Sequence, residues 1–220
     1  VHVYRKTTGA LTAKVLIGAF LGSTAMSSYA FAQQAAQAPA VEVHILESGA
    51  AMVDEKALTG ESVPCERRAG DRVLAAYRKL HLYDAFGYRE SASVAPGNDA
   101  LVADLELADG TTARLGVATC YDVRFPELFG ALADAGAQVI AVPTSWAPGP
   151  GKAEQWRILT SARALDSGAF IVAVDQAPPA GAGETRGPVG VGHSRVVDPF
   201  GSVVGDEYGR SPHLGFHNLD

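Results

Sequence analysis

The sequence predicts an α/β fold with mixed parallel and antiparallel strand connections. From residue 77 onward, apolar runs of strand length alternate with amphipathic stretches of helix length. The 24 Gly and 12 Pro residues cluster between these runs, which predicts many short connections. With 220 residues, of which 47% are hydrophobic and 19% charged, the chain is long and apolar enough to form a globular domain with a real core.

The expected elements follow in chain order. Residues 101–107 and 113–119 have the pattern of two strands joined by an Ala-Asp-Gly-Thr turn, which is a typical hairpin signal. The remaining elements are a helix over 125–135 ending at Gly136, a buried strand over 138–143, a helix over 152–167 ending at Gly168, a buried strand over 169–175, a Gly/Pro-rich loop over 178–188 and a hairpin formed by 192–197 and 202–206.

Charge and cysteine content exclude several kinds of partner. The formal net charge is −6, and the longest basic groupings are pairs such as Arg67-Arg68, so we expect no nucleic-acid partner. Two cysteines, Cys65 and Cys120, do not make a disulfide scaffold. No Cys-x-x-Cys motif indicates a metal site, and we expect neither a metal nor a cofactor.

Residues 1–40 resemble an export signal. Arg5, Lys6 and Lys14 form a basic start, residues 15–21 form a short apolar run, and an Ala-Phe-Ala pattern suited to cleavage follows. The alternative is an ordinary amphipathic or disordered N-terminus. The apolar run is too short for a membrane-spanning helix, so we expect no stable span.

Residues 53–73 contain the sequence Thr59-Gly-Glu-Ser62 and resemble the actuator loop of P-type cation-transport ATPases. In that family the matching glutamate, here Glu61, helps water attack an aspartyl phosphate. The chain contains no Asp-Lys-Thr-Gly phosphorylation motif, so we expect Glu61 to lie in a polar loop without this role. Residues 41–76 form a segment of uncertain structure, and the joining of such unlike segments predicts a chimeric chain.

Cys120 is the candidate nucleophile. It follows an apolar strand and precedes a turn and a helix. A thiol at such a position, facing a helix N-terminus, is expected to favour its thiolate form. A thiolate can attack an amide carbonyl, release ammonia or an amine, and leave a thioester that water hydrolyses. The alternative is a small buried core thiol.

Six stretches then occur in a characteristic order. They are Tyr77-Arg-Lys79-Leu-His-Leu, Phe86-Gly-Tyr-Arg-Glu-Ser91, Cys120-Tyr-Asp-Val-Arg-Phe-Pro-Glu127, Pro143-Thr-Ser-Trp146, Gln155-Trp-Arg-Ile-Leu-Thr-Ser-Ala-Arg-Ala164 and Gly192-His-Ser-Arg-Val-Val-Asp-Pro-Phe-Gly201. Together they resemble the nitrilase (carbon-nitrogen hydrolase) superfamily over about 77–210, within a domain spanning 77–220. The resemblance implies an α-β-β-α sandwich and a catalytic Glu-Lys-Cys set that cleaves non-peptide C–N bonds in amides, ω-amides or carbamoyl compounds.

The resemblance also suggests roles for residues around the thiol. Lys79 would stabilise the oxyanion together with the backbone N–H of Tyr121. Glu90 would place Lys79 or the substrate and keep the ammonium charged. Trp146 would form a wall of the substrate pocket. The alternatives are solvated surface charges at Lys79 and Glu90 and a core position for Trp146. We further expect Asp122 to belong to a structural ion-pair network with Arg124 and Glu127.

One expected component is missing. Thiol attack requires a general base, which the family takes from a glutamate in an N-terminal Pro-Glu context. No acidic residue before Tyr77 has these neighbours, and Glu47, after a strand-like run, is the best substitute. We therefore expect a sandwich that is incomplete at its N-terminus, with unpaired sheet edges, an uncovered apolar face, marginal stability and poor activity. The alternative is a catalytically inert fragment that acts as a binding module or has no function.

The resemblance has consequences for partners and location. It implies a small-molecule amide substrate and a homodimer or larger assembly. It suggests a cytoplasmic location, whereas the export-like start would place the protein outside the cytoplasm. The identity of the amide stays open, because the loops that would shape the pocket are either generic or absent.

Overall fold

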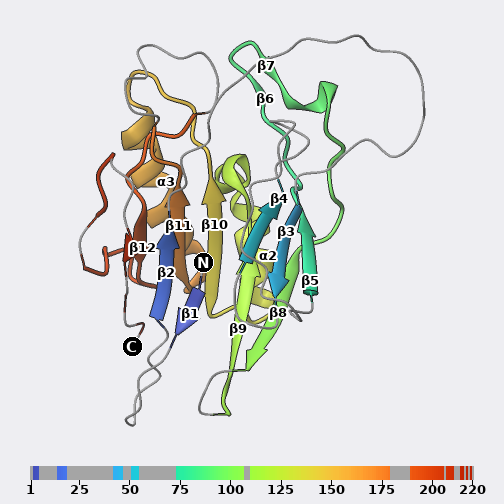
Figure 1. The fold of residues 1–220 in the computed structure, drawn as a ribbon, viewed down its shortest axis with the longest axis vertical. Helices are drawn as coiled ribbons and strands as arrows, with labels where there is room; N and C mark the ends of the chain where they lie inside the picture. The colour runs from blue at the N-terminus through green and yellow to red at the C-terminus, as the bar shows by residue number, and fades with distance from the viewer. Residues whose placement is uncertain are drawn as a thin grey trace.

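The computed structural model describes residues 2–4, 14–18, 42–46, 51–54, 73–106, 110–178, 189–205, 207–210, 214–215, 217 and 219. A five-stranded sheet organises this part of the chain, with the strand order β12-β11-β10-β9-β8 (Figure 1). Its strands are β8 (Leu101–Glu106), β9 (Thr112–Val117), β10 (Val139–Thr144), β11 (Phe170–Asp175) and β12 (Arg195–Val197).

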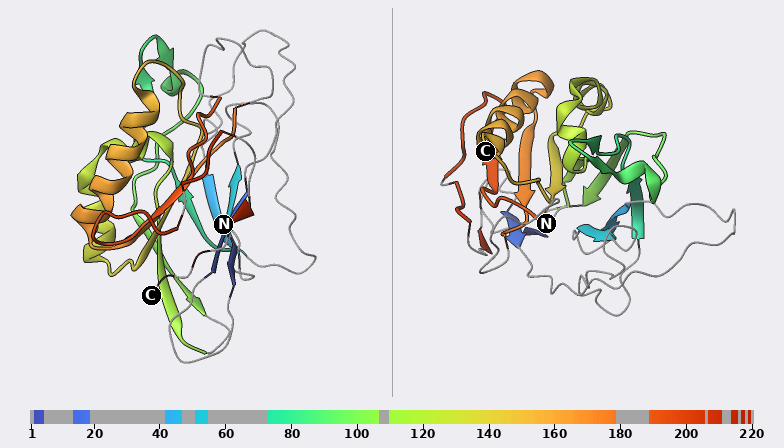
Figure 2. Two further views of the ribbon diagram at one scale, coloured as in Figure 1. Left: turned by 90° about the vertical axis from the view of Figure 1, so that its left-hand side faces the viewer. Right: turned by 90° about the horizontal axis from the view of Figure 1, so that it is seen from above.

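The sheet is mixed, as expected. β9, β10 and β11 run parallel, whereas β8 and β12 pair antiparallel at the two edges. Parallel neighbours need crossover connections, which α2 (Pro126–Asp134) and α3 (Lys152–Ser167) supply. Both helices lie on one face of the sheet (Figure 2). The residues of β10 are largely apolar because both faces of this central strand are covered.

Smaller elements complete the described fold. They are a sheet of β1 (His2–Tyr4), β2 (Lys14–Gly18) and β13 (Leu214–Gly215), a sheet of β4 (Ala51–Asp54), β3 (Glu42–Leu46) and β5 (Val73–Arg78), a hairpin of β6 (Asp84–Ala85) and β7 (Tyr88–Arg89), and the 3₁₀ turns η1 (Glu90–Ala92) and η2 (Cys120–Arg124). The two three-stranded sheets lie on the face of the main sheet opposite the helices (Figure 2).

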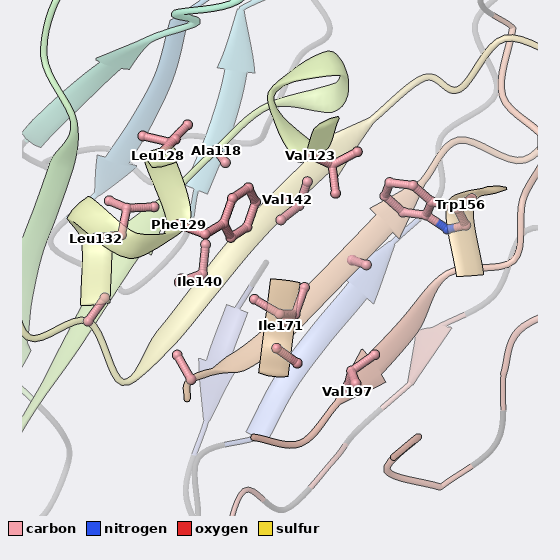
Figure 3. Packing of buried hydrophobic residues seen from close by; sticks show 14 of the residues in the cluster. Ala118, Val123, Leu128, Phe129, Leu132, Ile140, Val142, Trp156, Ile171 and Val197 are labelled. Atoms are coloured by element: carbon pink, nitrogen blue, oxygen red, sulfur yellow. The ribbon is translucent and has the colours of Figure 1, made fainter. Parts of the chain in front are cut away.

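The largest core fills the space between the helices and the main sheet (Figure 3). Phe129 of α2 and Trp156 of α3 are fully buried there. They pack with Ile140 of β10 and Ile171 of β11, so both crossover helices are fixed to the strands that they connect. Burial of large aromatic side chains contributes strongly to such a core.

The opposite face of the sheet is also buried, which corrects one expectation. Leu115, Val117 and Ala141 pack in a second cluster with Tyr77 from β5. A third cluster is centred on Val172, Val196 and Leu219. The apolar face that we expected to be uncovered is therefore closed off, because strands from the beginning and residues from the end of the chain return to it (Figure 2).

The elements agree closely with the sequence prediction except at the last hairpin. Among the described residues, the pairing of 192–197 with 202–206 is reduced to a bridge between Val197 and Val203. Gly192 and His193 have φ angles of 73° and 60°, so they cannot continue an extended strand. Within the described residues, no helix is long and apolar enough to cross a membrane.

Truncation of the central aromatic residue tests the importance of the main core. Phe129→Ala should lower the free energy of unfolding by about 3–5 kcal/mol, because the residue has no exposed surface and its neighbours cannot fill the cavity. Urea denaturation measures the loss. Ile158→Ala on the same layer is the control; its side chain is 58% exposed, and its loss should stay below about 1 kcal/mol. Equal losses in the two variants would contradict this packing.

Candidate active site

The candidate site lies where several strands end. Cys120 begins η2, shortly after β9, and Trp146 follows β10. Lys79 directly follows β5. In open α/β sheets the carboxyl ends of parallel strands are the usual place for a binding site. β10 points toward the end of the molecule that carries the β6–β7 hairpin, so this hairpin lies near the site (Figure 1).

The backbone at Cys120 is strained. Its φ angle of 49° is in the left-handed region, which non-glycine residues seldom adopt. The turn is held by Asp122, whose Oδ2 accepts a hydrogen bond from the backbone N–H of Thr119 at 2.9 Å. Strain of this kind is maintained by surrounding contacts and occurs often at functional sites.

Asp122 also holds the segment that carries Lys79. This fully buried carboxylate accepts hydrogen bonds from the Tyr77 hydroxyl at 2.7 Å and from the backbone N–H and Nδ1 of His81 at 2.9 and 2.8 Å. Burial and the nearby charge of Asp122 raise the pKa of Tyr77, which therefore remains a donor. Because Tyr77 and His81 lie on either side of Lys79 in sequence, these bonds fix the lysine beside the cysteine turn.

Lys79 and Glu90 form a buried ion pair. Lys79 Nζ lies 2.6 Å from Glu90 Oε2, and the two side chains are 3% and 2% exposed. The same oxygen accepts a hydrogen bond from the backbone N–H of Tyr83 at 2.5 Å. Burial alone would lower the pKa of Lys79, but the charges of Cys120 and Glu90 outweigh this effect and raise it. The ammonium is therefore held in place and kept charged.

A glycine allows the Glu90 loop to approach this segment closely. The backbone N–H of Gly97 donates a hydrogen bond to the carbonyl oxygen of Lys79 at 2.8 Å. A Cβ atom at this position would lie 2.4 Å from the carbonyl oxygen of Arg78, which is too close for any other residue. The loop that supplies Glu90 is thus fastened at both ends to the Lys79 segment.

The thiol itself is not activated in the described structure. Burial raises the pKa of Cys120 to about 11, although the Lys79 charge and a contact of Sγ with the Ser145 carbonyl oxygen, at 3.7 Å, oppose the shift. Our expectation that the position favours the thiolate is therefore wrong, because desolvation outweighs the favourable charges. Near neutral pH the thiol is protonated, and its attack requires a base.

Among the described residues, no carboxylate forms a hydrogen bond with the thiol, whose one such partner is the Ser145 carbonyl oxygen. Glu90 is bound to Lys79. Asp175, at the end of β11, accepts hydrogen bonds from the backbone N–H groups of Trp146 and Val191, both at 2.7 Å. Burial raises the pKa of Asp175 to about 8. Glu47, the predicted substitute base, lies outside the described residues.

A pocket that is partly open to solvent lies beside the thiol. Its lining residues are Tyr83, Cys120, Tyr121, Arg124, Ser145, Trp146, Ala147 and Lys152. The Trp146 indole N–H donates to the Lys152 carbonyl oxygen at 2.9 Å, and the ring is 4% exposed, so it belongs both to the pocket wall and to the core. Among the described residues, no group of three or more side chains is suited to hold a metal ion.

Sequence reasoning placed Cys120, Lys79, Glu90, Tyr121 and Trp146 near one another, and the structure gathers them around this pocket or its supporting ion pair. The prediction that Asp122 forms an ion-pair network with Arg124 and Glu127 is wrong. Among the described residues, Arg124 donates instead to Gln155 Oε1 at 2.6 Å. The anchoring role of Asp122 was missed, because its partners come from a distant segment.

Comparison with known proteins identifies the family. The Carbon-nitrogen hydrolase family matches residues 66–212, which is more than half of the chain. The match begins before residue 77, where the sequence motifs placed its start, and includes the end of the ATPase-like segment. The chain belongs to the carbon-nitrogen hydrolase family.

Relatives with curated descriptions include hydrolases and amidases. A hydrolase of Mycobacterium tuberculosis is 47% identical over 151 residues, which cover 66% of this chain and 52% of that protein. A deaminated glutathione amidase of Bos taurus is 41% identical over 138 residues, covering 60% of this chain and 39% of that protein. The matched region spans 45% to 64% of the length of the first four curated relatives.

Solved structures confirm the nitrilase-like α/β fold. Nit3 of Saccharomyces cerevisiae, a member of the nitrilase superfamily, has a TM-score of 0.56 and 29% identity, covering 68% of this chain and 49% of that chain. A variant amidase from Nesterenkonia sp. AN1 has a TM-score of 0.55 and 36% identity, covering 67% of this chain and 50% of that chain. In that amidase, the acetamide moiety of fluoroacetamide has added covalently to the active-site cysteine.

Removal of one charge should reveal the cost of the buried ion pair. Glu90→Gln leaves the Lys79 ammonium buried without its counter-charge and should lower the free energy of unfolding by about 3–5 kcal/mol. Urea denaturation measures this effect. The double variant Glu90→Gln with Lys79→Met is the control and should recover part of the loss. A single variant as stable as the unmodified protein would show that the pair is not buried.

The reactivity of Cys120 should depend strongly on pH. Only the thiolate reacts with iodoacetamide, so alkylation should accelerate as pH rises toward the pKa of about 11. Lys79→Met should move the midpoint still higher, because the ammonium no longer stabilises the thiolate. Mass spectrometry of the labelled Cys120 peptide gives the rate at each pH. A midpoint that falls or stays unchanged in Lys79→Met would contradict the electrostatic contact.

Proposed function

We propose that the chain carries the thiol and oxyanion-binding parts of a hydrolase of non-peptide C–N bonds, acting on amides, ω-amides or carbamoyl compounds. One observation carries this proposal: the segment that carries the buried Lys79 and the turn that carries the strained Cys120 are both hydrogen-bonded to the same carboxylate, Asp122. A pocket opens beside the thiol. The relatives that are deaminated glutathione amidases support hydrolysis of a C–N bond. They do not favour the alternative of an inert binding module.

The proposed reaction proceeds through a thioester. The Cys120 sulfur attacks the amide carbonyl carbon, and the carbonyl oxygen takes up negative charge in a tetrahedral species. The Lys79 ammonium and the backbone N–H of Tyr121 stabilise this oxygen. Glu90 acts through Lys79, which it positions and keeps charged. Departure of ammonia or an amine leaves the thioester, which water hydrolyses to the acid.

The proton on the thiol limits this reaction. With a pKa of about 11, Cys120 is protonated near neutral pH, and a general base must remove the proton as the bond forms. Glu47 remains the predicted base within this chain. We propose that turnover by this chain alone is slow unless such a carboxylate reaches the thiol, and that it rises toward alkaline pH as the thiolate forms.

Several finer predictions remain proposals. The export-signal-like segment 1–40 and the ATPase-like segment 53–73 lie mostly outside the described residues, and so does Glu61. We also propose self-association into a homodimer or larger assembly, in line with the family resemblance. Leu165 and Phe200 support this proposal, since these large apolar side chains are 61% and 84% exposed. Light scattering coupled to size-exclusion chromatography would decide the oligomeric state.

Ammonia release tests the proposed activity. The purified chain is incubated with short aliphatic amides at pH 7 to 10, and ammonia is measured with an enzyme-coupled assay. Cys120→Ala should abolish release, and Lys79→Met should lower it by about a hundredfold or more, because removal of one oxyanion donor has effects of this size.

A matched surface variant controls for unspecific effects. Arg114→Gln removes one positive charge far from the pocket, from a side chain that is 48% exposed and pairs with Asp104. Its ammonia release should equal that of the unmodified protein. Release that persists unchanged in Cys120→Ala would show that the thiol is not the nucleophile.

A further inference from the structure

Tyr83 brings a hydroxyl group to the pocket beside the thiol. Its side chain lines the pocket together with Cys120 and Ser145 and is half-buried. Within the described residues, the contacts of Tyr83 are backbone hydrogen bonds and ring contacts, so its hydroxyl has no hydrogen-bond partner in this part of the chain. A polar group that lines a pocket without an internal partner is available to a bound molecule.

The backbone of Tyr83 is fixed by the buried ion pair. Its N–H donates to Glu90 Oε2 at 2.5 Å, the oxygen that also pairs with Lys79, and its carbonyl oxygen accepts the backbone N–H of Glu90 at 3.2 Å. Tyr83 follows Lys79 on the segment that Asp122 anchors through His81. The position of the Tyr83 backbone relative to Lys79 and the thiol is therefore set by contacts that the site already requires.

Aromatic neighbours fix the direction of the ring. The ring centre of Tyr83 lies 5.1 Å from that of Tyr121, with an angle of 67° between the two ring planes, and 5.6 Å from that of Tyr88. Aromatic contacts with this spacing, and above all the edge-to-face arrangement, are favourable. Because Tyr121 directly follows Cys120, its contact holds the Tyr83 ring against the turn that carries the thiol.

The environment keeps the Tyr83 hydroxyl protonated. Burial raises the pKa of Tyr83 most, the negative charge of the Cys120 thiolate raises it further, and the Arg124 charge only partly opposes this rise. The hydroxyl is therefore a hydrogen-bond donor near neutral pH, and it does not replace the general base that Cys120 requires. The influence of the sulfur charge also indicates that the hydroxyl lies close to the thiol, because such influence falls off with distance.

Cleavage of an amide needs a proton donor beside the nitrogen. An amide nitrogen leaves a tetrahedral species readily only when it receives a proton, and a positioned acid contributes about 10²–10⁴-fold to the rate of such a step. Lys79 is held by Glu90 and is assigned to the carbonyl oxygen. The thiol bonds to the Ser145 carbonyl oxygen and not to Tyr83, so the amide group of a substrate joined to Sγ can lie between the sulfur and the Tyr83 hydroxyl.

We propose that Tyr83 is a further catalytic residue, whose hydroxyl donates a proton to the departing nitrogen. The inference rests on the proposed function for the attack by the Cys120 thiolate. As the C–N bond breaks, the nitrogen keeps the electron pair and takes the Tyr83 proton, so ammonia or an amine leaves and a thioester and a tyrosinate remain. The tyrosinate then takes a proton from the water that attacks the thioester. The C–S bond breaks, and the acid, the Cys120 thiolate and neutral Tyr83 result.

Two substrates with the same acyl group test this role. Propionamide needs protonation of its nitrogen, whereas p-nitrophenyl propionate releases p-nitrophenolate, which leaves without a proton. Tyr83→Phe removes only the hydroxyl and keeps the ring and the backbone bonds to Glu90. Ammonia release should fall by about a hundredfold or more, while release of p-nitrophenolate in the first turnover should stay within about threefold and thereby show that the variant folds. Cys120→Ala gives the background for both measurements.

Tyr88→Phe is the matched control. It removes a hydroxyl from the neighbouring ring, which does not line the pocket, and both rates should equal those of the unmodified protein. Equal losses for the amide and the ester in Tyr83→Phe would indicate a structural role and overturn the inference, and so would unchanged ammonia release. In both cases the unmodified protein is active, so the proposed function stands. Release of neither product by the unmodified protein would remove the proposed function and this role with it.

Discussion

The buried carboxylate of Asp122 is the contact on which the site depends. It accepts hydrogen bonds from Tyr77 and His81 on one segment and from the turn that begins at Cys120 on the other. Buried N–H and O–H groups without a hydrogen-bond acceptor would destabilise the folded protein. Asp122 therefore holds the Lys79 segment and the Cys120 turn together, although they are far apart in sequence. Lys79 lies between the two donor residues, and its position beside the thiol follows from theirs.

The buried environment of the site affects Lys79 and Cys120 in opposite ways: Lys79 stays charged, whereas Cys120 stays neutral. The Glu90 carboxylate keeps the buried Lys79 charged near neutral pH, which prepares an oxyanion site. The same burial raises the pKa of Cys120 to about 11, and one ammonium does not reverse it. The described residues thus provide stabilisation for a developing negative oxygen, whereas removal of the thiol proton requires a further group. A preformed oxyanion site and a protonated nucleophile are compatible in an enzyme that transfers the proton to a base only during attack.

The local pattern of apolar and polar residues was sufficient to predict most of the helices and strands. The sequence motifs were sufficient to predict the site residues that lie within them. The bounds of α3 were predicted because Gly168, in the left-handed conformation, ends the helix. The buried strand around Ile140 followed from its apolar run, and Cys120 from its place after a strand. The contacts of Asp122 depend on residues that are distant in sequence, which a single sequence does not encode locally. The covered second face of the sheet was missed for the same reason.

A double-mutant cycle on the thiol pKa tests the anchoring most directly. The pH midpoint of Cys120 alkylation is measured in the unmodified protein, in Lys79→Met, in Asp122→Asn and in the double variant. If Asp122 holds the lysine beside the thiol, Lys79→Met raises the midpoint clearly in the presence of Asp122 and much less in Asp122→Asn. An equal rise in both backgrounds would show that the lysine reaches the thiol without this anchor and would contradict the account.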